Sequence, residues 1–184
     1  MRIIGGEFKS RIFNPGKNFK ARPTTDFARE NLFNILSNRL DFENSKILDL
    51  FSGTGGISFE FASRGCPSIT CIELNRFHFV FICSVIEKLN LKNRIKPFNV
   101  DVFRFIGKSK EQFDIIFADP PYDLKRLPEM PDLIMNSNLL DRQGLFILEH
   151  GKQNNFTSHP DFTELRVYGS VHFSFFRHHL ENEV

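Results

Sequence analysis

A glycine-rich turn follows an apolar run in the sequence Leu48-Asp49-Leu50-Phe51-Ser52-Gly53-Thr54-Gly55-Gly56, a pattern typical of a strand that leads into a helix. Glycine has no Cβ, so the backbone at positions 53, 55 and 56 can turn tightly and approach a ligand closely. Glu73 ends the next apolar run, 20 residues after Gly53. A carboxylate at that distance is placed to bind the ribose hydroxyls of a nucleoside that lies across the strand ends.

From Lys46 onward, short apolar runs alternate with segments of helical period. The runs are apolar on both faces, as in a parallel sheet that is covered by helices on both sides. The sequence therefore predicts an α/β fold, a Rossmann-like doubly wound sandwich. The predicted strands are 47–51, 69–73, 95–100, 113–118 and 145–149, and the predicted helices are 57–64, 75–91, 102–110 and 127–140.

The two ends of the chain depart from this alternation. Segments 163–168 and 171–177 are joined by Gly169-Ser170, which leaves no room for a helix and predicts an antiparallel hairpin at one edge of the sheet. Pro97 predicts that its own strand lies at an edge. A helix is expected to begin near Thr24 or Thr25, which can cap it. We therefore divide the chain into a basic extension, 1–23, and a main domain, 24–184.

Composition narrows the class of protein. The chain has 184 residues, 41% of them hydrophobic, which suits one domain. Phenylalanine is abundant, with 23 residues against two Tyr and no Trp, and we expect it to fill the core. The three cysteines form no C-x-x-C pair, and the six histidines show no metal-ligand spacing. These features, with the lack of a signal peptide or a long apolar span, predict a soluble cytoplasmic protein without a metal site. Nothing in the sequence demands more than a monomer, although the oligomeric state stays open.

Charge is uneven along the chain. Residues 1–40 hold eight Lys or Arg and three acids, a net +5, whereas the remainder holds 16 basic and 19 acidic residues, a net −3. A basic segment beside a mildly acidic body suggests an arm that faces a polyanion, although a solvated basic loop gives the same pattern. The candidate nucleic-acid-binding residues are Arg2, Lys9, Arg11, Arg22 and Arg29.

A second motif, Asp119-Pro120-Pro121-Tyr122, follows the predicted strand 113–118. The two prolines fix successive φ angles and hold the backbone extended beyond the strand end. An exocyclic amine of a nucleic-acid base is a poor nucleophile, because its lone pair is delocalised into the ring. Hydrogen bonds to the Asp119 carboxylate and the Pro120 carbonyl would favour a pyramidal nitrogen and stabilise the positive charge that develops on it. Tyr122 offers an aromatic face on which the base can stack.

Two cofactor classes fit a glycine loop of this kind. A dinucleotide fold requires a third glycine where this chain has Ser58, and a pyrophosphate would lie poorly beside Asp49. An acid at that position suits a cofactor with an amino group or a sulfonium charge. The loop therefore favours S-adenosylmethionine.

Together these motifs resemble the class I N-methyltransferases. The chain as a whole is similar to the RsmD family of small-subunit (16S) rRNA guanine-N2 methyltransferases over about residues 1–177. The specific matches are Met1-Arg-Ile-Ile-Gly-Gly6, Arg22-Pro-Thr24, Arg29-Glu30 with Leu32-Phe-Asn-Ile35, and Ser63-Arg-Gly65.

The resemblance implies a seven-stranded, mostly parallel sheet and an N-terminal hairpin whose basic surface meets RNA in an assembling small subunit. It also implies that the 51–56 loop holds the cofactor, with Glu73 on the ribose and Asp101-Val102 beside the adenine. The cofactor-binding set is then Asp49, Phe51, Ser52, Gly53, Gly55, Glu73, Leu74, Asp101 and Val102. From the sequence alone, Asp101 could equally be a helix N-cap.

Three rival functions remain at this stage. A DNA adenine-N6 or cytosine-N4 methyltransferase uses the same tetrapeptide, but this chain has no segment left for a separate target-recognition region. A non-catalytic RNA-binding protein could share the scaffold, although it would not need an intact Asp119 and Tyr122. A nicotinamide oxidoreductase would require the missing third glycine.

Overall fold

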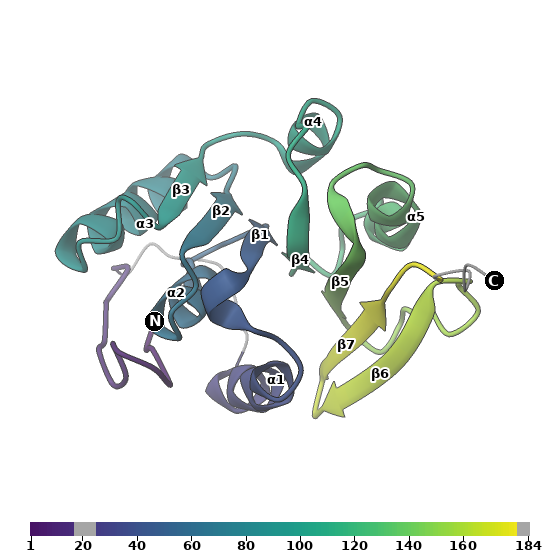
Figure 1. Ribbon diagram of the computed structural model, residues 1–184, viewed down its shortest axis with the longest axis horizontal. Coiled ribbons are helices and arrows are strands. Elements are labelled where there is room, and N and C mark those ends of the chain that lie inside the picture. The colour runs from purple at the N-terminus through teal and green to yellow at the C-terminus, as the bar shows by residue number, and fades with distance from the viewer. Residues whose placement is uncertain (17–24, 180–184) are drawn as a thin grey trace.

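The protein is described by a computed structural model that covers residues 1–16 and 25–179. Its seven strands form one sheet in the order β3-β2-β1-β4-β5-β7-β6, with helices on both faces (Figure 1). The strands are β1 Lys46–Leu50, β2 Ser68–Ile72, β3 Ile95–Phe98, β4 Phe113–Ala118, β5 Leu140–His150, β6 Phe162–Tyr168 and β7 Val171–Phe176. The predicted α/β sandwich is confirmed.

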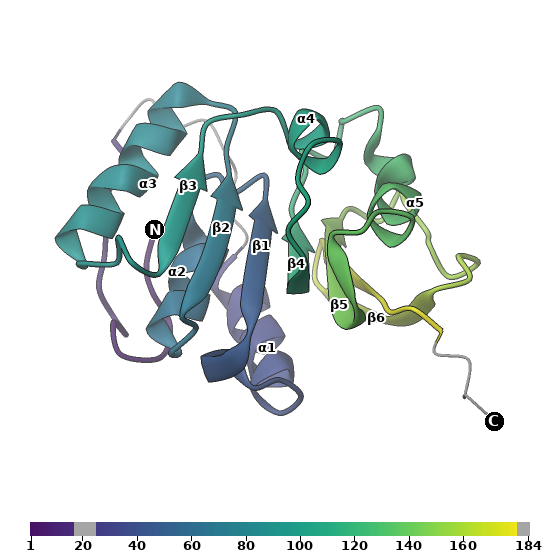
Figure 2. The ribbon, with the colours of Figure 1, turned by 45° about the horizontal axis from the view of Figure 1, so that its top comes forward.

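The first five strands are parallel, and the last two are not. β1 pairs with β2 and β4, β2 pairs with β3, and β4 pairs with β5, all in parallel. β7 pairs antiparallel with both β5 and β6, which confirms the predicted C-terminal hairpin. β3 lies at the other edge of the sheet, as Pro97 predicts. Figure 2 shows the arrowheads of β1, β2 and β3 at one edge.

The helices divide between the two faces of the sheet. They are α1 Asp26–Ser37, α2 Gly56–Ser63, α3 Arg76–Lys88, α4 Val102–Ile106 and α5 Met130–Met135, with short 3-10 turns η1 Phe42–Asn44 and η2 Leu127–Glu129. Buried side chains of α1, α2 and α3 join one apolar core, and those of α4, η2 and α5 join the other.

Strand residues alternate between these two cores. On β4, Ile115 and Phe117 enter the core under α1–α3, whereas Ile116 and Ala118 enter the core under α4 and α5. The period of two explains why the strand sequences are apolar on both faces. Nine Phe side chains are among the largest fully buried groups, which confirms their predicted use as core residues.

One predicted helix, 127–140, is wrong in its extent. The segment folds as η2 and the six-residue α5, and β5 already begins at Leu140. Ser137 explains the early end of the helix, because its hydroxyl donates to the Ile134 carbonyl (2.7 Å) and accepts from the Leu139 N–H (3.2 Å). Such local side-chain bonds compete with the helical pattern. The predicted helix 102–110 likewise ends early, at Ile106 before Gly107.

The N-terminal segment is built into the main core. Met1 and Phe13 exchange backbone hydrogen bonds, and Arg2 and Ile12 form an antiparallel bridge, so residues 1–13 fold back on themselves. Ile3 and Phe8 are buried in the same core as α1 and α2. The predicted boundary between residues 23 and 24 lies outside the described residues.

Thr25 caps α1, since its hydroxyl accepts from the Ala28 N–H. Thr24, the alternative cap, lies outside the described residues. Over residues 1–16 and 25–179, no helix is long and apolar enough to cross a bilayer.

Candidate active site

A cavity of about 810 Å³ opens where β1, β2, β4 and β5 end. Strand order reverses between β1 and β4, and open α/β sheets bind ligands at such a reversal. Nearly all the predicted catalytic and cofactor-binding residues line this cavity: Asp49, Phe51, Ser52, Gly53, Glu73, Leu74, Asp101, Val102, Asp119, Pro120, Pro121 and Tyr122. Gly55 is the exception, and it lies beside the cavity as the N-cap of α2.

The glycine loop uses left-handed backbone conformations. Phe51 (φ 61°), Gly53 (φ 54°) and Gly55 (φ 75°) all have positive φ. A Cβ on Gly55 would lie 2.7 Å from the Phe59 ring, so only glycine fits there. At Gly53 the nearest such contact is the Phe51 carbonyl oxygen at 4.0 Å, so its outer side is open. A bulky residue such as Phe51 rarely adopts this conformation, and strained backbone of this kind is concentrated at functional sites.

Glu73 joins the glycine loop to α3. One carboxylate oxygen accepts from the Gly53 N–H (2.7 Å), and the other accepts from the Asn75 N–H (2.6 Å). A carboxylate offers about four lone-pair sites, so these two bonds leave capacity for ribose hydroxyls. The Glu73 residue is 9% exposed at the cavity wall.

Asp49 lies under the loop with 1% of its surface exposed. Its carboxylate accepts from the Ser58 hydroxyl (2.6 Å) and the Ser58 N–H (3.2 Å). Burial raises the pKa of Asp49 to about 7, although the bonds from Ser58 and Ser52 oppose the shift. A cationic group in the cavity would hold this carboxyl in its ionised form.

Asp101 combines a capping contact with a place in the cavity lining. Its side chain caps α4 by accepting from the Arg104 N–H at 2.9 Å, and the residue also lines the cavity. Val102, Phe103 and Leu74 also line the cavity, and Leu74 leaves 64% of its surface exposed. This wall therefore presents apolar surface next to an acid.

The tetrapeptide 119–122 lies at the end of β4, next to β1. The Asp119 N–H reaches the Leu50 carbonyl at 3.4 Å. The Tyr122 hydroxyl donates to the Glu149 carboxylate at 3.0 Å, and the Gln153 amide donates to the Tyr122 carbonyl. Ala118 on β4 and Leu148 on β5 are register partners. Asp119 and Glu149 are the next residues along these neighbouring strands.

Glu149 was missed by the sequence analysis. It is 3% exposed, lines the cavity and binds the tyrosine of the tetrapeptide. The rule that found Glu73, an acid at the end of a predicted parallel strand, applies equally to Glu149 in the predicted strand 145–149. The position of Glu149 at the end of a predicted strand could therefore have identified it as a candidate site residue.

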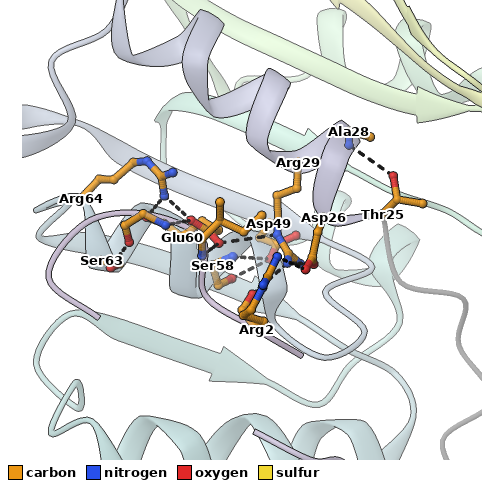
Figure 3. A network of polar contacts seen from close by, with 12 residues as sticks. Arg2, Thr25, Asp26, Ala28, Arg29, Asp49, Ser58, Glu60, Ser63 and Arg64 are labelled. Atoms are coloured by element: carbon orange, nitrogen blue, oxygen red, sulfur yellow. Dashed lines mark hydrogen bonds and ion pairs between the residues drawn. The ribbon is translucent and has the colours of Figure 1, made fainter. Parts of the chain in front are cut away.

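Arg29 requires a correction. The prediction that it belongs to an RNA-facing surface is contradicted, because it is 3% exposed and ion-paired with Asp26 and Glu60. It lines the cavity instead, and Figure 3 shows it among Arg2, Asp26 and Glu60. Its spacing to Leu32 and Leu36, three and seven residues away on the buried stripe of α1, was the available signal.

The other candidate RNA-binding residues differ in their placement. Lys9 and Arg11 are exposed on the folded N-terminal segment, and the Arg11 guanidinium lies over the Phe8 ring. The Arg2 side chain is 54% exposed and forms an ion pair with Asp26. Arg22 lies outside the described residues.

Comparison with known proteins identifies the family. Residues 1–177 match the family described as Conserved hypothetical protein 95. The Ribosomal RNA small subunit methyltransferase D of Buchnera aphidicola subsp. Baizongia pistaciae is 36% identical over 151 residues, which cover 81% of this chain and 75% of that protein. The chain belongs to the RsmD family of S-adenosylmethionine-dependent methyltransferases.

Further relatives extend over the full chain. The protein of the same name from Escherichia coli (strain K12) is 27% identical over 186 residues, which cover 100% of this chain and 92% of the relative. A solved structure, described as a putative methyltransferase yhhF from Escherichia coli, superposes with a TM-score of 0.80 at 28% identity and covers 96% of each chain. The whole fold of this RsmD-family chain is thus shared with a solved methyltransferase-like structure.

The polar and apolar groups that line the cavity fit a ligand that combines a nucleoside with an amino acid. Glu73 can accept from ribose hydroxyls, the wall around Leu74 and Val102 can cover a base, and Asp49 can face an ammonium group. The open side of Gly53 leaves room for close approach. Within the described part of the chain, no cluster of three or more His, Cys, Asp or Glu side chains is arranged to hold a metal.

The raised pKa of Asp49 predicts a pH-dependent stability that Asp49→Asn should remove. In the unfolded chain Asp49 releases its proton near pH 3.9, whereas the folded protein holds it up to about pH 7. The free energy of unfolding of the wild type should therefore fall, relative to Asp49→Asn, as pH rises from about 4 to about 7. Urea denaturation of both proteins without cofactor measures the difference. Parallel stability curves across this range would contradict the assignment.

Proposed function

We propose that this chain transfers a methyl group from S-adenosylmethionine to the exocyclic N2 amine of a guanine in small-subunit ribosomal RNA. The observation that carries the proposal is the single cavity that joins Asp119 and Tyr122 to the glycine loop and Glu73. Family membership and relatives named Ribosomal RNA small subunit methyltransferase D support the choice of substrate.

The cofactor would occupy the side of the cavity formed by β1, β2 and α4. The bound cofactor supplies an electrophilic methyl group on a sulfonium sulfur. Glu73 accepts from the ribose, while Leu74 and Val102 cover the adenine beside Asp101. Asp49, which lines the cavity, would face the ammonium group, and this contact would keep its carboxyl ionised.

Asp119 and Pro120 hold the amine that is methylated. The Asp119 carboxylate and the Pro120 carbonyl accept from the two N–H groups, which turns the nitrogen lone pair toward the cofactor side of the cavity. Positive charge develops on that nitrogen during transfer, and the fixed negative partners stabilise it. Pro120 and Pro121 keep both acceptors in place, so little reorganisation is needed.

Tyr122 and Glu149 select and orient the base. The base stacks on the Tyr122 ring, whose hydroxyl is fixed by Glu149. Guanine presents N1–H and N2–H donors along one edge, which suit a site lined by two carboxylates. Adenine presents an acceptor at N1, and a buried acceptor that faces a carboxylate is costly. Glu149 therefore favours guanine over the adenine of the DNA methyltransferase alternative.

The folded N-terminal segment would provide the RNA contact. Lys9 and Arg11 are exposed on it, and Arg2 keeps half of its side chain accessible. We assign this basic surface, with the undescribed stretch that contains Arg22, to the phosphate backbone of rRNA in a small subunit or an assembly intermediate. The enzyme would act as a monomer in the cytoplasm, where its three free cysteines stay reduced.

Asp119→Asn should separate chemistry from cofactor binding. We expect kcat for methyl transfer to small ribosomal subunits to fall by at least about 10²-fold, because the developing charge loses its fixed partner. The Kd of S-adenosylhomocysteine, measured by calorimetry, should stay nearly unchanged. Asp123→Asn, an exposed carboxylate four residues further along and outside the cavity lining, is the matched control. Equal loss of turnover and cofactor affinity in Asp119→Asn would mean that Asp119 is structural.

Replacing Lys9 and Arg11 together by Ala should weaken RNA binding in a salt-dependent manner. Each phosphate contact contributes about 0.7–0.9 to the slope of log affinity against log salt concentration, so the slope should fall by about 1.5. Filter binding of small-subunit RNA over a salt series measures it. Arg142→Ala is the control, because this exposed arginine lies at the opposite end of β5 from the cavity. An unchanged slope in the double variant would remove the N-terminal segment from the RNA interface.

A further inference from the structure

Arg29 is a buried cation in the wall of the cofactor cavity. It lies in the first turn of α1 and is 3% exposed, yet it lines the cavity together with Thr25, Thr54 and Gly56. A Cβ built on Gly56 would come within 2.8 Å of the Arg29 Nη1 atom. The guanidinium therefore lies directly against the start of α2, where the glycine loop ends.

Three protein groups fix the orientation of this guanidinium (Figure 3). Nη2 donates to the Arg2 carbonyl (2.8 Å) and to the Asp26 carboxylate (2.6 Å). Nε lies 3.5 Å from the Glu60 carboxylate, in ion-pair range, but this buried atom makes no hydrogen bond. With these contacts, Nη1 faces the glycine loop, and the buried Nε is left without a hydrogen bond.

The cluster around Arg29 holds more positive than negative charge. Its cations are Arg2, Arg29 and Arg64, and its anions are Asp26 and Glu60, which also accepts from the backbone of Ile4. Burial lowers the pKa of Arg29 despite Glu60 and Asp26, which raise it. A buried charge is costly unless it is paired, so the cluster favours an anion on the cavity side.

We propose that Arg29 binds the α-carboxylate of the cofactor's amino-acid part. The inference rests on the proposed function, which places S-adenosylmethionine in this cavity. A guanidinium matches a carboxylate with parallel N–H donors, and it stays charged when it is buried. Asp49, which lines the same cavity and is bound to Ser58, faces the ammonium group, so the two charges of the amino acid meet opposite partners.

The arrangement also links the N-terminal segment to the cofactor. The Arg2 carbonyl holds Arg29, and Glu60 binds both the Ile4 N–H and the Arg29 side chain. The N-terminal segment, whose outer surface is assigned to RNA, thus positions Arg29, the residue that binds the cofactor's carboxylate.

A comparison of two ligands tests the role of Arg29 directly. S-adenosylhomocysteine has the α-carboxylate, whereas its decarboxylated analogue keeps the adenosine, the thioether and the ammonium group. Calorimetry on the full chain should show that the wild type prefers S-adenosylhomocysteine by about 10–100-fold, the range of a charged hydrogen-bonded pair. Arg29→Gln should lose that preference by binding S-adenosylhomocysteine more weakly, with the affinity for the analogue unchanged.

Arg64→Gln is the matched control. It removes a cation that shares Glu60 with Arg29 but does not line the cavity, so the ligand preference should survive. Arg29→Lys keeps the charge and loses the planar fork, and it should show a reduced preference with near-wild-type thermal stability. This variant carries the test if Arg29→Gln fails to fold.

Three outcomes would overturn the inference. If Arg29→Gln or Arg29→Lys weakens both ligands equally, Arg29 only supports the fold. If the wild type binds the two ligands equally, another group or none binds the carboxylate. If the wild type binds neither ligand, the proposed function itself fails, and the inference falls with it.

Discussion

Parallel strands that share a sheet end at the same edge, and the site in this protein depends on that constraint. β1, β2, β4 and β5 each deliver an acid to the cavity near their carboxyl ends, namely Asp49, Glu73, Asp119 and Glu149. The reversal of strand order between β1 and β4 opens a crevice beyond their carboxyl ends, because the connections leave toward opposite faces. Residues up to 100 positions apart in the sequence thereby line one cavity.

A second constraint is electrostatic. Glu60 has none of its surface exposed and is shared by Arg29, Arg64 and the backbone of Ile4. A carboxylate buried so deeply is stable only while its partners remain, so it ties α1, α2 and the N-terminal segment together. The basic N-terminal segment is therefore packed into the main body, with Ile3 and Phe8 in the core and Lys9 and Arg11 on its outer surface.

Much of this could be predicted from the sequence because the signals were local. The glycine loop, the acid of Glu73 and the rigid Asp119–Tyr122 tetrapeptide each follow an apolar run, and Pro97 marked an edge strand. The errors had two sources, local side-chain hydrogen bonds and tertiary context. The segment 127–140 has helical composition, but Ser137 ends the helix through its own hydrogen bonds. Arg29 belongs to a basic stretch, yet Glu60 and Asp26 draw it inward. The roles of the individual site residues remain predictions.

The central claim is that the two carboxylates and the tyrosine beside the cofactor loop select the N2 amine of guanine. Mass-spectrometric identification of the nucleoside that this protein methylates in small ribosomal subunits lacking the modification tests it most directly. The account predicts N2-methylguanosine, formed by the wild type alone. Methyl groups found on adenine N6 or cytosine N4 would keep the fold and the cofactor site but contradict the assigned geometry of base recognition.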